Sequence, residues 1–340
     1  LREGLDRVLQ AARGALVVVS DSPAVLSICT GGFLLDAEFT PQRLSELAKM
    51  DGAIILTADA SRIARANVHL MPRASIPTSE TGTRHRTAER VARSVGVPVV
   101  SVSEEMGTIT VYRGALRHLL RPAEQLIARS TYLLSTLERF RQRFDEADAS
   151  LTASEIGDVV TAGEVAHLLQ RAEMVLRVAA GVDELLDELG EHGRLLRLQL
   201  SELTASVGDE RRLVLEDYLR PHDGASSAPD ADVVLGRLGD LATDELLGIE
   251  RFVSVLDGSG APPSLDEALE PRGLRLLRRV PELASDTISL LLQQFDGLHE
   301  IIRAPMGELA AAAQLSDEEA RIVKDGLARL ASSSILERYR

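Results

Sequence analysis

Residues 81–90 read TGTRHRTAER, and this stretch places two arginines and a histidine at consecutive positions, Arg84, His85 and Arg86. Apolar residues at helical spacing follow from Ala88 onward. A helix that begins here would turn its first backbone N–H groups and its positive dipole end outward, and arginine forks bind phosphate with two hydrogen bonds. The stretch therefore indicates an anion site at a helix start. A solvated basic loop is the alternative that these residues alone leave open.

Apolar strands and helices alternate around this stretch. A continuous apolar run at residues 14–19 predicts a buried strand, and residues 51–56, entered through Asp51 and Gly52, predict a second one. Further strands are predicted at 67–70, 97–103 and 108–112. Helices are predicted over residues 2–12, over 41–50 with Thr40 as the N-cap, and over 84–95 with Gly96 as the C-cap. We expect residues 1–122 to form an α/β domain around a mixed central sheet, with the pattern of strands and helices interrupted at residues 31–33.

The pattern changes after Pro122 to long helical periodicity. We expect residues 123–264 to form an all-α spine whose apolar faces make a core or an oligomer seam. It would include a capping box at Thr152 and Glu155, helices over 185–203 and 232–256, and loops at 221–230 and 258–263. Residues 265–340 predict a small binding module of short helices over 274–280, 286–295, 297–303, 306–312 and 317–330.

Composition excludes several classes of function. The net charge of −14 argues against a generally basic nucleic-acid binder. A single cysteine, Cys29, excludes an internal disulfide framework and fits the reducing cytoplasm, and no apolar run reaches a membrane-spanning length. The two lysines, Lys49 and Lys324, do not follow a glycine, so the chain has no P-loop. Because residue 1 is Leu, we expect residues before it in the natural protein.

Two motifs together carry a resemblance. Asp-Gly-Ala at residues 51–53, followed by Gly-Thr-Arg-His-Arg at 82–86, resembles the motif pair of the diadenylate cyclase family. The strand at 14–19, the Gly-Gly-Phe at 31–33 and the Ser-Val-Ser at 101–103 come in the same order. The helical middle and the array of short helices narrow the resemblance to members that carry a spine and a tandem helix-hairpin-helix domain. The resemblance covers the whole chain, and the motif pair is more specific than Asp-Gly-Ala alone.

The resemblance implies a reaction in which two ATP molecules condense to cyclic di-AMP and two pyrophosphates. Such phosphoryl transfer depends on charge neutralisation and in-line positioning. Arg84 and Arg86 would clamp phosphates, and His85 would lie beside them as a hydrogen-bond donor. Asp51 would hold Mg²⁺ or Mn²⁺, help to remove the proton of the 3′-hydroxyl, or both.

The resemblance also implies an ATP-binding set, namely Gly52, Ala53, Leu70, Thr83, Thr87 and Ser103. Gly52 and Ala53 would let the backbone approach the ribose, and Leu70 would form part of the adenine pocket. Thr87 and Ser103 would add hydroxyl contacts. Plain structural roles stay open for some of these residues: a turn cap for Asp51, a loop contact for His85, a core position for Leu70 and a strand position for Ser103.

Assembly follows from the implied reaction. Each site of the family holds one ATP, so two cyclase domains must face each other and the protein must be at least a dimer. The resemblance extends this to an octamer of two tetramers, in which the spine takes part. The implied partners are ATP, further copies of the chain and branched DNA, with no membrane.

The C-terminal module departs from the family pattern. A helix-hairpin-helix turn usually reads Gly-hydrophobic-Gly so that its N–H groups can approach a phosphate, but here the turns read Glu-Leu-Ala at 282–284 and Gln-Leu-Ser at 314–316. Residues 266–340 carry 10 Arg and Lys against 13 Asp and Glu, a net charge of −3, with three carboxylates at 317–319. Since DNA binding favours the opposite sign, we expect weak or altered binding through a remaining basic cluster, Arg272, Arg275, Arg278 and Arg279.

Three functional hypotheses therefore remain. The first is a diadenylate cyclase, and the second is a sensor of branched DNA in which DNA binding regulates the cyclase. The third is an oligomeric scaffold with an inactive nucleotide pocket. The intact Asp51 and the intact Arg-His-Arg run argue against the third, and the altered hairpins favour the first over the second.

Overall fold

The computed structural model describes residues 1–219, 229–257, 264–313 and 315–338, with side chains through residue 332. The chain divides into two compact units, one of Leu1–Ser130 with Glu184–Arg197 and the other of Thr131–Asp183 with Leu198–Arg340. The loop predicted over 258–263 and most of the loop predicted over 221–230 lie outside the described residues.

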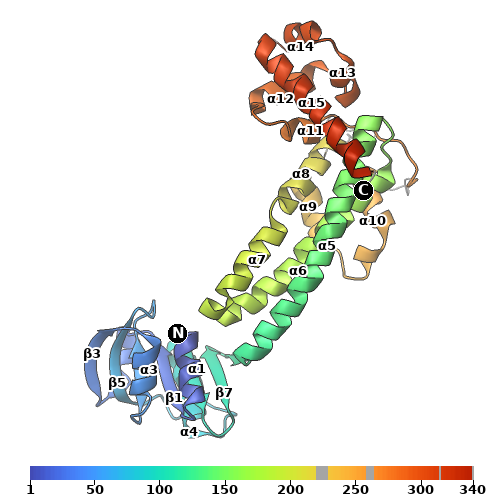
Figure 1. The fold of residues 1–340 in the computed structure, drawn as a ribbon. Helices are drawn as coiled ribbons and strands as arrows, with labels where there is room; N and C mark the ends of the chain where they lie inside the picture. The colour runs from blue at the N-terminus through green and yellow to red at the C-terminus, as the bar shows by residue number, and fades with distance from the viewer. Residues whose placement is uncertain (220–228, 258–263, 314, 339–340) are drawn as a thin grey trace. The chain divides into compact units, whose positions relative to one another are not determined.

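A mixed sheet of eight strands forms the centre of the first unit (Figure 1). The strand order is β2-β5-β4-β1-β6-β7-β8, and β3 pairs with β5. β1 runs parallel to β4, whereas it is antiparallel to β6. The predicted α/β domain with a mixed sheet is confirmed. The strands are β1 Ala15–Val19, β2 Cys29–Thr30, β3 Phe33–Glu38, β4 Ala53–Leu56, β5 Arg62–Leu70, β6 Val99–Ser103, β7 Thr108–Arg113 and β8 Leu116–Leu120.

Both faces of the sheet are covered by helices. Val17 of β1 packs in a core with α1 (Arg2–Gln10) and α3 (Pro41–Leu47), whereas its neighbour Val18 packs on the other face with α2 (Pro23–Leu26) and α4 (Thr83–Val95). Successive strand side chains point to opposite faces, so a strand covered on both sides reads as a continuous apolar run. The predicted N-cap of α3 and the predicted C-cap of α4 are confirmed. Thr40 accepts a hydrogen bond from the N–H of Arg43, and Gly96 ends α4 at a φ of 76°.

Three of the strands, β2, β3 and β8, were not predicted from the sequence. β3 begins at Phe33, where the pattern was predicted to be interrupted, and is exposed at most positions. β8 is exposed along nearly its whole length. β5 begins at Arg62, five residues before the strand predicted at 67–70. A strand with one or both faces exposed to solvent lacks the continuous apolar run of a buried strand. Such strands are therefore not predicted from hydrophobicity.

The helical region follows β8 and differs from the prediction in three places. The predicted helix over 185–203 is broken by a 3₁₀ turn, and the one over 232–256 is interrupted between α9 and α10. The predicted capping box is wrong: Thr152 lies inside α5, where its hydroxyl donates to the carbonyl of Asp148 four residues earlier. The elements are α5 Ala123–Gly157, α6 Ala162–Leu189, η1 Gly190–Gly193, α7 Arg194–Thr204, α8 Val207–Tyr218, α9 Ala231–Gly239, η2 Glu245–Leu247 and α10 Ile249–Asp257.

Five further helices close the chain around an apolar core of their own. Leu276, Leu291, Leu298, Leu309 and Val323 contribute one buried side chain from each helix. The predicted array of short helices is confirmed, except that the last helix is longer than expected. The helices are α11 Leu274–Arg278, α12 Ser285–Gln294, α13 Leu298–Arg303, α14 Met306–Ala312 and α15 Asp317–Arg338. Over the described residues, every helix is too short or too polar to cross a membrane.

Candidate active site

A pocket of about 790 Å³ opens where α4 begins beside the ends of two central strands. Its walls come from the loop before β4, the first turn of α4 and the chain that leaves β6. Because the start of α4 contributes to the wall, N–H groups that have no acceptor within the helix lie beside the cavity. The lining residues are Asp51, Gly82, Thr83, Arg84, His85, Val102, Ser103, Glu104 and Glu105.

Asp51 supplies an exposed carboxylate at the pocket. Its side chain is 98% exposed, and its Oδ1 accepts a hydrogen bond of 3.0 Å from the N–H of Gly52. Gly52 adopts a φ of +89°, and a Cβ there would lie 2.9 Å from the carbonyl carbon of Asn67 on β5. Glycine is therefore required both by the backbone conformation and by the close approach of β5. This local geometry presents the Asp51 carboxylate to solvent just before the start of β4.

The Arg84 guanidinium lies so close to Gly14 that a side chain at that position would collide with it. Its Nη2 is 3.7 Å from Oδ1 of Asp51. A Cβ on Gly14, the residue before β1, would lie 2.5 Å from Nη1 of Arg84 and 2.9 Å from its Cζ. Gly14 therefore makes room for the guanidinium beside Asp51. The sequence pattern predicted Gly14 only as the start of a strand, and a glycine directly before an apolar run was the one available signal for this role.

His85 is almost completely buried, with 5% of its surface exposed, although it lines the pocket. Its Nδ1 lies 2.9 Å from the hydroxyl of Tyr112 on β7, and its Nε2 is hidden from solvent without a hydrogen-bond partner among the described residues. Burial lowers the pKa of His85, because it penalises the charged imidazolium. Burial, together with the negative charge of the nearby Glu80, raises the pKa of Tyr112 to about 12. No sequence signal singled out Tyr112.

The pocket contains five of the residues predicted from the sequence and leaves out the other five. Asp51, Thr83, Arg84, His85 and Ser103 line it, whereas Gly52, Ala53, Leu70, Arg86 and Thr87 do not. The Ala53 and Leu70 side chains are buried in the core between the sheet and α4. For Leu70, this is the core position that the sequence had left open as an alternative. The Thr87 hydroxyl donates to the carbonyl of Thr83 on its own helix, and the Arg86 side chain is exposed.

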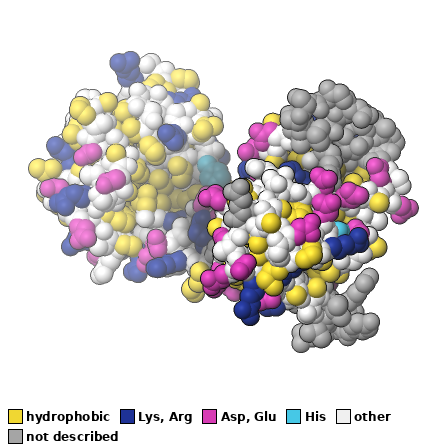
Figure 2. All heavy atoms as spheres, turned by 90° about the horizontal axis from the view of Figure 1, so that it is seen from above, with side chains coloured by type: hydrophobic (Ala, Val, Ile, Leu, Met, Phe, Trp, Pro, Cys, Tyr) yellow, Lys and Arg dark blue, Asp and Glu magenta, His cyan; other side chains and the backbone are white. Residues whose placement is uncertain are grey.

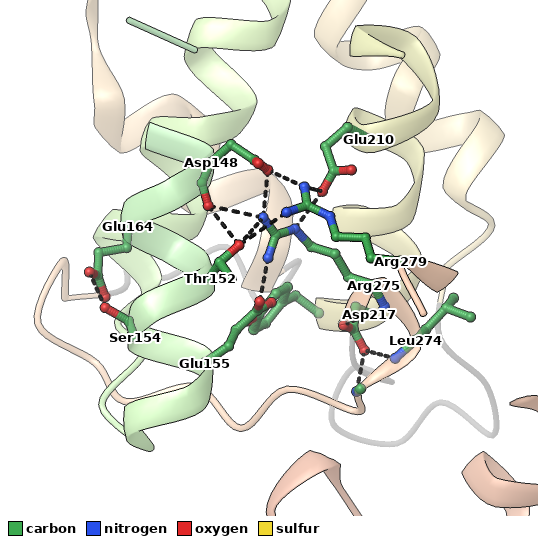
Figure 3. A network of polar contacts seen from close by, with 12 residues as sticks. Asp148, Thr152, Ser154, Glu155, Glu164, Glu210, Asp217, Leu274, Arg275 and Arg279 are labelled. Carbon is green, nitrogen blue, oxygen red and sulfur yellow. Dashed lines mark hydrogen bonds and ion pairs between the residues drawn. The ribbon is translucent and has the colours of Figure 1, made fainter. Parts of the chain in front are cut away.

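Arg275, one of the four arginines predicted to contact DNA, does not lie at the protein surface. Arg275 on α11 is fully buried and forms ion pairs with Asp148, Glu155 and Glu210 (Figure 3). Arg279 is also paired, with Asp148 and Glu210. The prediction that Arg275 contacts a DNA backbone is therefore wrong, because its guanidinium is neutralised inside the protein. Arg272 and Arg278 remain exposed.

The two hairpin turns lie where the sequence placed them. The first joins α11 to α12 and the second joins α14 to α15, although Gln314 lies outside the described residues. Glu282 in the first turn adopts a φ of +67°, a conformation that favours glycine. Figure 2 shows Asp and Glu side chains interspersed with Arg and Lys over the nearer, helical region, and no continuous basic area on the described residues of that face.

Comparisons with known proteins identify the family. The family described as the DisA bacterial checkpoint controller nucleotide-binding region matches residues 2–116, and the DisA bacterial checkpoint controller linker region matches residues 120–264. The DNA integrity scanning protein DisA of Streptomyces coelicolor is 46% identical over 339 residues, covering 100% of this chain and 90% of that protein. The protein of the same name from Kineococcus radiotolerans is also 46% identical, covering 100% of this chain and 94% of that protein. The chain therefore belongs to the DisA family of diadenylate cyclases.

Proposed function

We propose that this protein condenses two ATP molecules into cyclic di-AMP and two pyrophosphates. The observation that carries the proposal is the pocket in which Asp51, Arg84 and Ser103 meet beside the start of α4. In the reaction, each ribose 3′-oxygen bonds to the α-phosphorus of the other ATP. The bond between the α- and β-phosphates breaks, pyrophosphate leaves with the electron pair, and each hydroxyl gives up its proton.

The residues of the pocket suit the phosphate end of ATP. Arg84 would neutralise charge on the phosphates, and the free N–H groups at the start of α4 would donate to their oxygens. Thr83 and Ser103 add hydroxyls to the same wall. Arg86 is exposed outside the pocket lining, so we propose that it reaches a phosphate of the nucleotide held by a facing copy.

A divalent cation fits the donor set at Asp51. Mg²⁺ in nucleotide sites is typically bound by one or two carboxylates together with substrate phosphates and water. Among the described residues, no three His, Cys, Asp or Glu side chains converge as a ready metal site. One exposed carboxylate beside a phosphate pocket matches the first pattern. Asp51 and the ATP phosphates would hold Mg²⁺ or Mn²⁺, which would supply further neutralisation of phosphate charge.

The reaction needs two copies of the pocket. Each pocket offers one Asp51 and one Arg84, whereas the product has two symmetric phosphodiester bonds. We therefore propose a face-to-face dimer as the catalytic unit and an octamer as the full assembly. Leu195 and Leu198 on α7 are strongly exposed, which supports a further contact between copies in the helical region.

Incubation with ATP and either Mg²⁺ or Mn²⁺, followed by mass spectrometry, tests the cyclase proposal directly. We expect cyclic di-AMP and pyrophosphate in a ratio of one to two, and no product without the metal. Asp51→Asn should abolish the product while the protein remains folded. Asp209→Asn, which changes an exposed aspartate on α8, is the matched control and should leave turnover unchanged. Full activity of Asp51→Asn would refute the role given to that carboxylate.

We also propose, as a second function, weak recognition of branched DNA by the C-terminal helices. Two helix hairpins and the exposed Arg272 and Arg278 support it. The charge balance opposes it, since Asp317, Glu318 and Glu319 occupy the first turn of α15 beside the second hairpin. The affinity for a four-way junction should accordingly be low and should fall as salt is raised.

A further inference from the structure

The start of α4 carries no side-chain cap. Its N-cap is Gly82, which has no side chain to accept from the N–H groups of the first turn, whereas a serine or aspartate there would use one of these donors. Gly82 and the three residues that follow it line the pocket, so the unused donors are those of the proposed phosphate site. Because helix ends fray, another contact has to hold this end if the site is to be formed before ATP binds.

A buried carboxylate of α4 contacts the segment that leads into the helix. Glu89 is 7% exposed, and it accepts a hydrogen bond from the hydroxyl of Thr78, which precedes α4. The same hydroxyl accepts from the N–H of Glu80 at 3.1 Å, which closes a tight turn. The Glu80 carboxylate in turn accepts from Nε of Arg117 on β8 at 2.7 Å. The chain is therefore fixed to α4 and to the sheet just before it enters the helix.

Two arginines of α4 hold the same segment at the preceding residues. Nε of Arg90 donates to the carbonyl of Ile76 at 3.0 Å, and Nη1 of Arg93 donates to the carbonyl of Pro77 at 3.0 Å. Nη2 of Arg93 also pairs with Oε1 of Glu89 at 2.8 Å, so both oxygens of that carboxylate are engaged. The segment before α4 is therefore held along the side of the helix by three of the helix's own side chains.

We propose that Glu89, acting through Thr78, is a positioning residue that holds the uncapped start of α4 in place for the phosphates of ATP. The inference rests on the proposed cyclase function and adds the residues that form the site in advance. Gly82 leaves the first-turn N–H groups unused, so they remain available to phosphate. The hydrogen bond between Thr78 and Glu89 replaces the missing cap, so binding does not have to order the helix start.

Hydrogen–deuterium exchange of the full chain without nucleotide, followed by mass spectrometry, tests whether this hydrogen bond holds the helix start. The N–H of Arg86 donates to the carbonyl of Gly82 at 2.9 Å and closes the first turn, so peptides that contain Arg86 report on fraying. Thr78→Val removes the hydroxyl and keeps the shape, and these peptides should exchange faster. Thr78→Ser keeps the hydroxyl and should exchange like the wild type. Ser94→Ala, which removes a hydroxyl near the other end of α4, is the control and should leave these peptides unchanged.

Steady-state kinetics with ATP and Mg²⁺ test the consequence for the reaction. In Thr78→Val and Glu89→Gln, ATP has to order a mobile helix start, so the KM for ATP should rise and kcat should fall, each roughly 10-fold. Thr78→Ser and Ser94→Ala should keep both constants. A variant that only lost folded protein would instead lower the apparent kcat and leave KM unchanged. The double variant of Thr78 and Glu89 should lose much less kcat/KM than the product of the two single effects, because both substitutions remove one hydrogen bond.

Wild-type exchange or wild-type kinetics in Thr78→Val would overturn the proposal, and so would single effects that multiply in the double variant. If the wild type makes no cyclic di-AMP, the proposed function fails. The exchange experiment still decides in that case whether Thr78 and Glu89 hold the start of α4.

Discussion

Arg275 and Glu155 form an ion pair in which both side chains are completely buried, at 0% exposure each. They are 120 positions apart in the sequence, so the pair fastens α11 to the end of α5. Arg275 also binds Asp148 and Glu210, and Asp217 accepts from three N–H groups at the start of α11. The first helix of the C-terminal array is thus attached to the long helices through buried charge.

Arg275→Met should destabilise the protein strongly. The substitution keeps much of the volume but leaves the Glu155, Asp148 and Glu210 carboxylates without their central cation in a buried site. Breaking one side of such a pair costs about 3–5 kcal/mol. Urea unfolding followed by circular dichroism measures the loss. Arg278→Met on the same helix, where the side chain is exposed, should change stability by less than about 0.5 kcal/mol. Equal effects of the two variants would contradict the structural role of Arg275.

Gly14→Ala should impair the cyclase without unfolding it. The new methyl group would occupy the space of Nη1 of Arg84, and the flexible end of that side chain can move away at little cost to the fold. The guanidinium would then leave its place beside Asp51, and we expect cyclic di-AMP formation to fall by roughly 10- to 100-fold. Turnover and thermal unfolding of the same sample check both halves of the prediction. Gly236→Ala, where a Cβ meets open space, is the control.

Stability in acid should depend on Glu188. Burial opposes ionisation of this carboxylate, but hydrogen bonds from the Arg121 side chain and N–H outweigh burial and lower its pKa below the ordinary 4.5. A lowered pKa means that the stabilisation is present above about pH 4.5 and is lost as the pH falls through the folded-state value. Glu188→Gln should therefore be less stable than the wild type at pH 7, by about 1–3 kcal/mol.

Urea unfolding at pH 7 and at pH 3.5 measures this difference, which should narrow at the lower pH. Glu184→Gln, an exposed glutamate on the same helix, should behave like the wild type at both. A difference that does not depend on pH would show that the Glu188 carboxylate does not stabilise the fold through its charge.

Glu282→Gly should strengthen binding to a four-way DNA junction. Glycine relieves the positive φ of residue 282 and removes a carboxylate from the hairpin between α11 and α12. Glu282→Gln removes the charge but keeps the strained backbone, so the two variants separate charge from conformation. Binding measured over a range of salt concentrations should rank Glu282→Gly above Glu282→Gln and both above the wild type. Nanomolar affinity of the wild-type protein would show that the altered hairpins do not weaken binding.

Several features could be predicted from the sequence because they depend on neighbouring residues. The apolar runs that became β1 and β4, the Thr40 and Gly96 caps and the start of α4 are of this kind. The motif pair likewise indicated Asp51, Thr83, Arg84 and His85, and all four line one pocket. Exposed strands such as β3 and β8 were missed, because their pairing partners rather than their own hydrophobicity define them.

The order of the helical array, the buried strands and the motifs of the phosphate pocket could be predicted, because periodicity, capping and motif spacing are local. Which charged side chains are paired and which are exposed depends on the tertiary fold. Arg275 and Arg278 lie three positions apart in one short basic cluster, yet one is enclosed by carboxylates from distant helices and the other is exposed. Likewise, Gly14 lies beside Arg84, and Tyr112 beside His85, only because the folded sheet brings these residues together. Burial and ion pairing depend on residues far apart in the chain, which local sequence patterns do not encode.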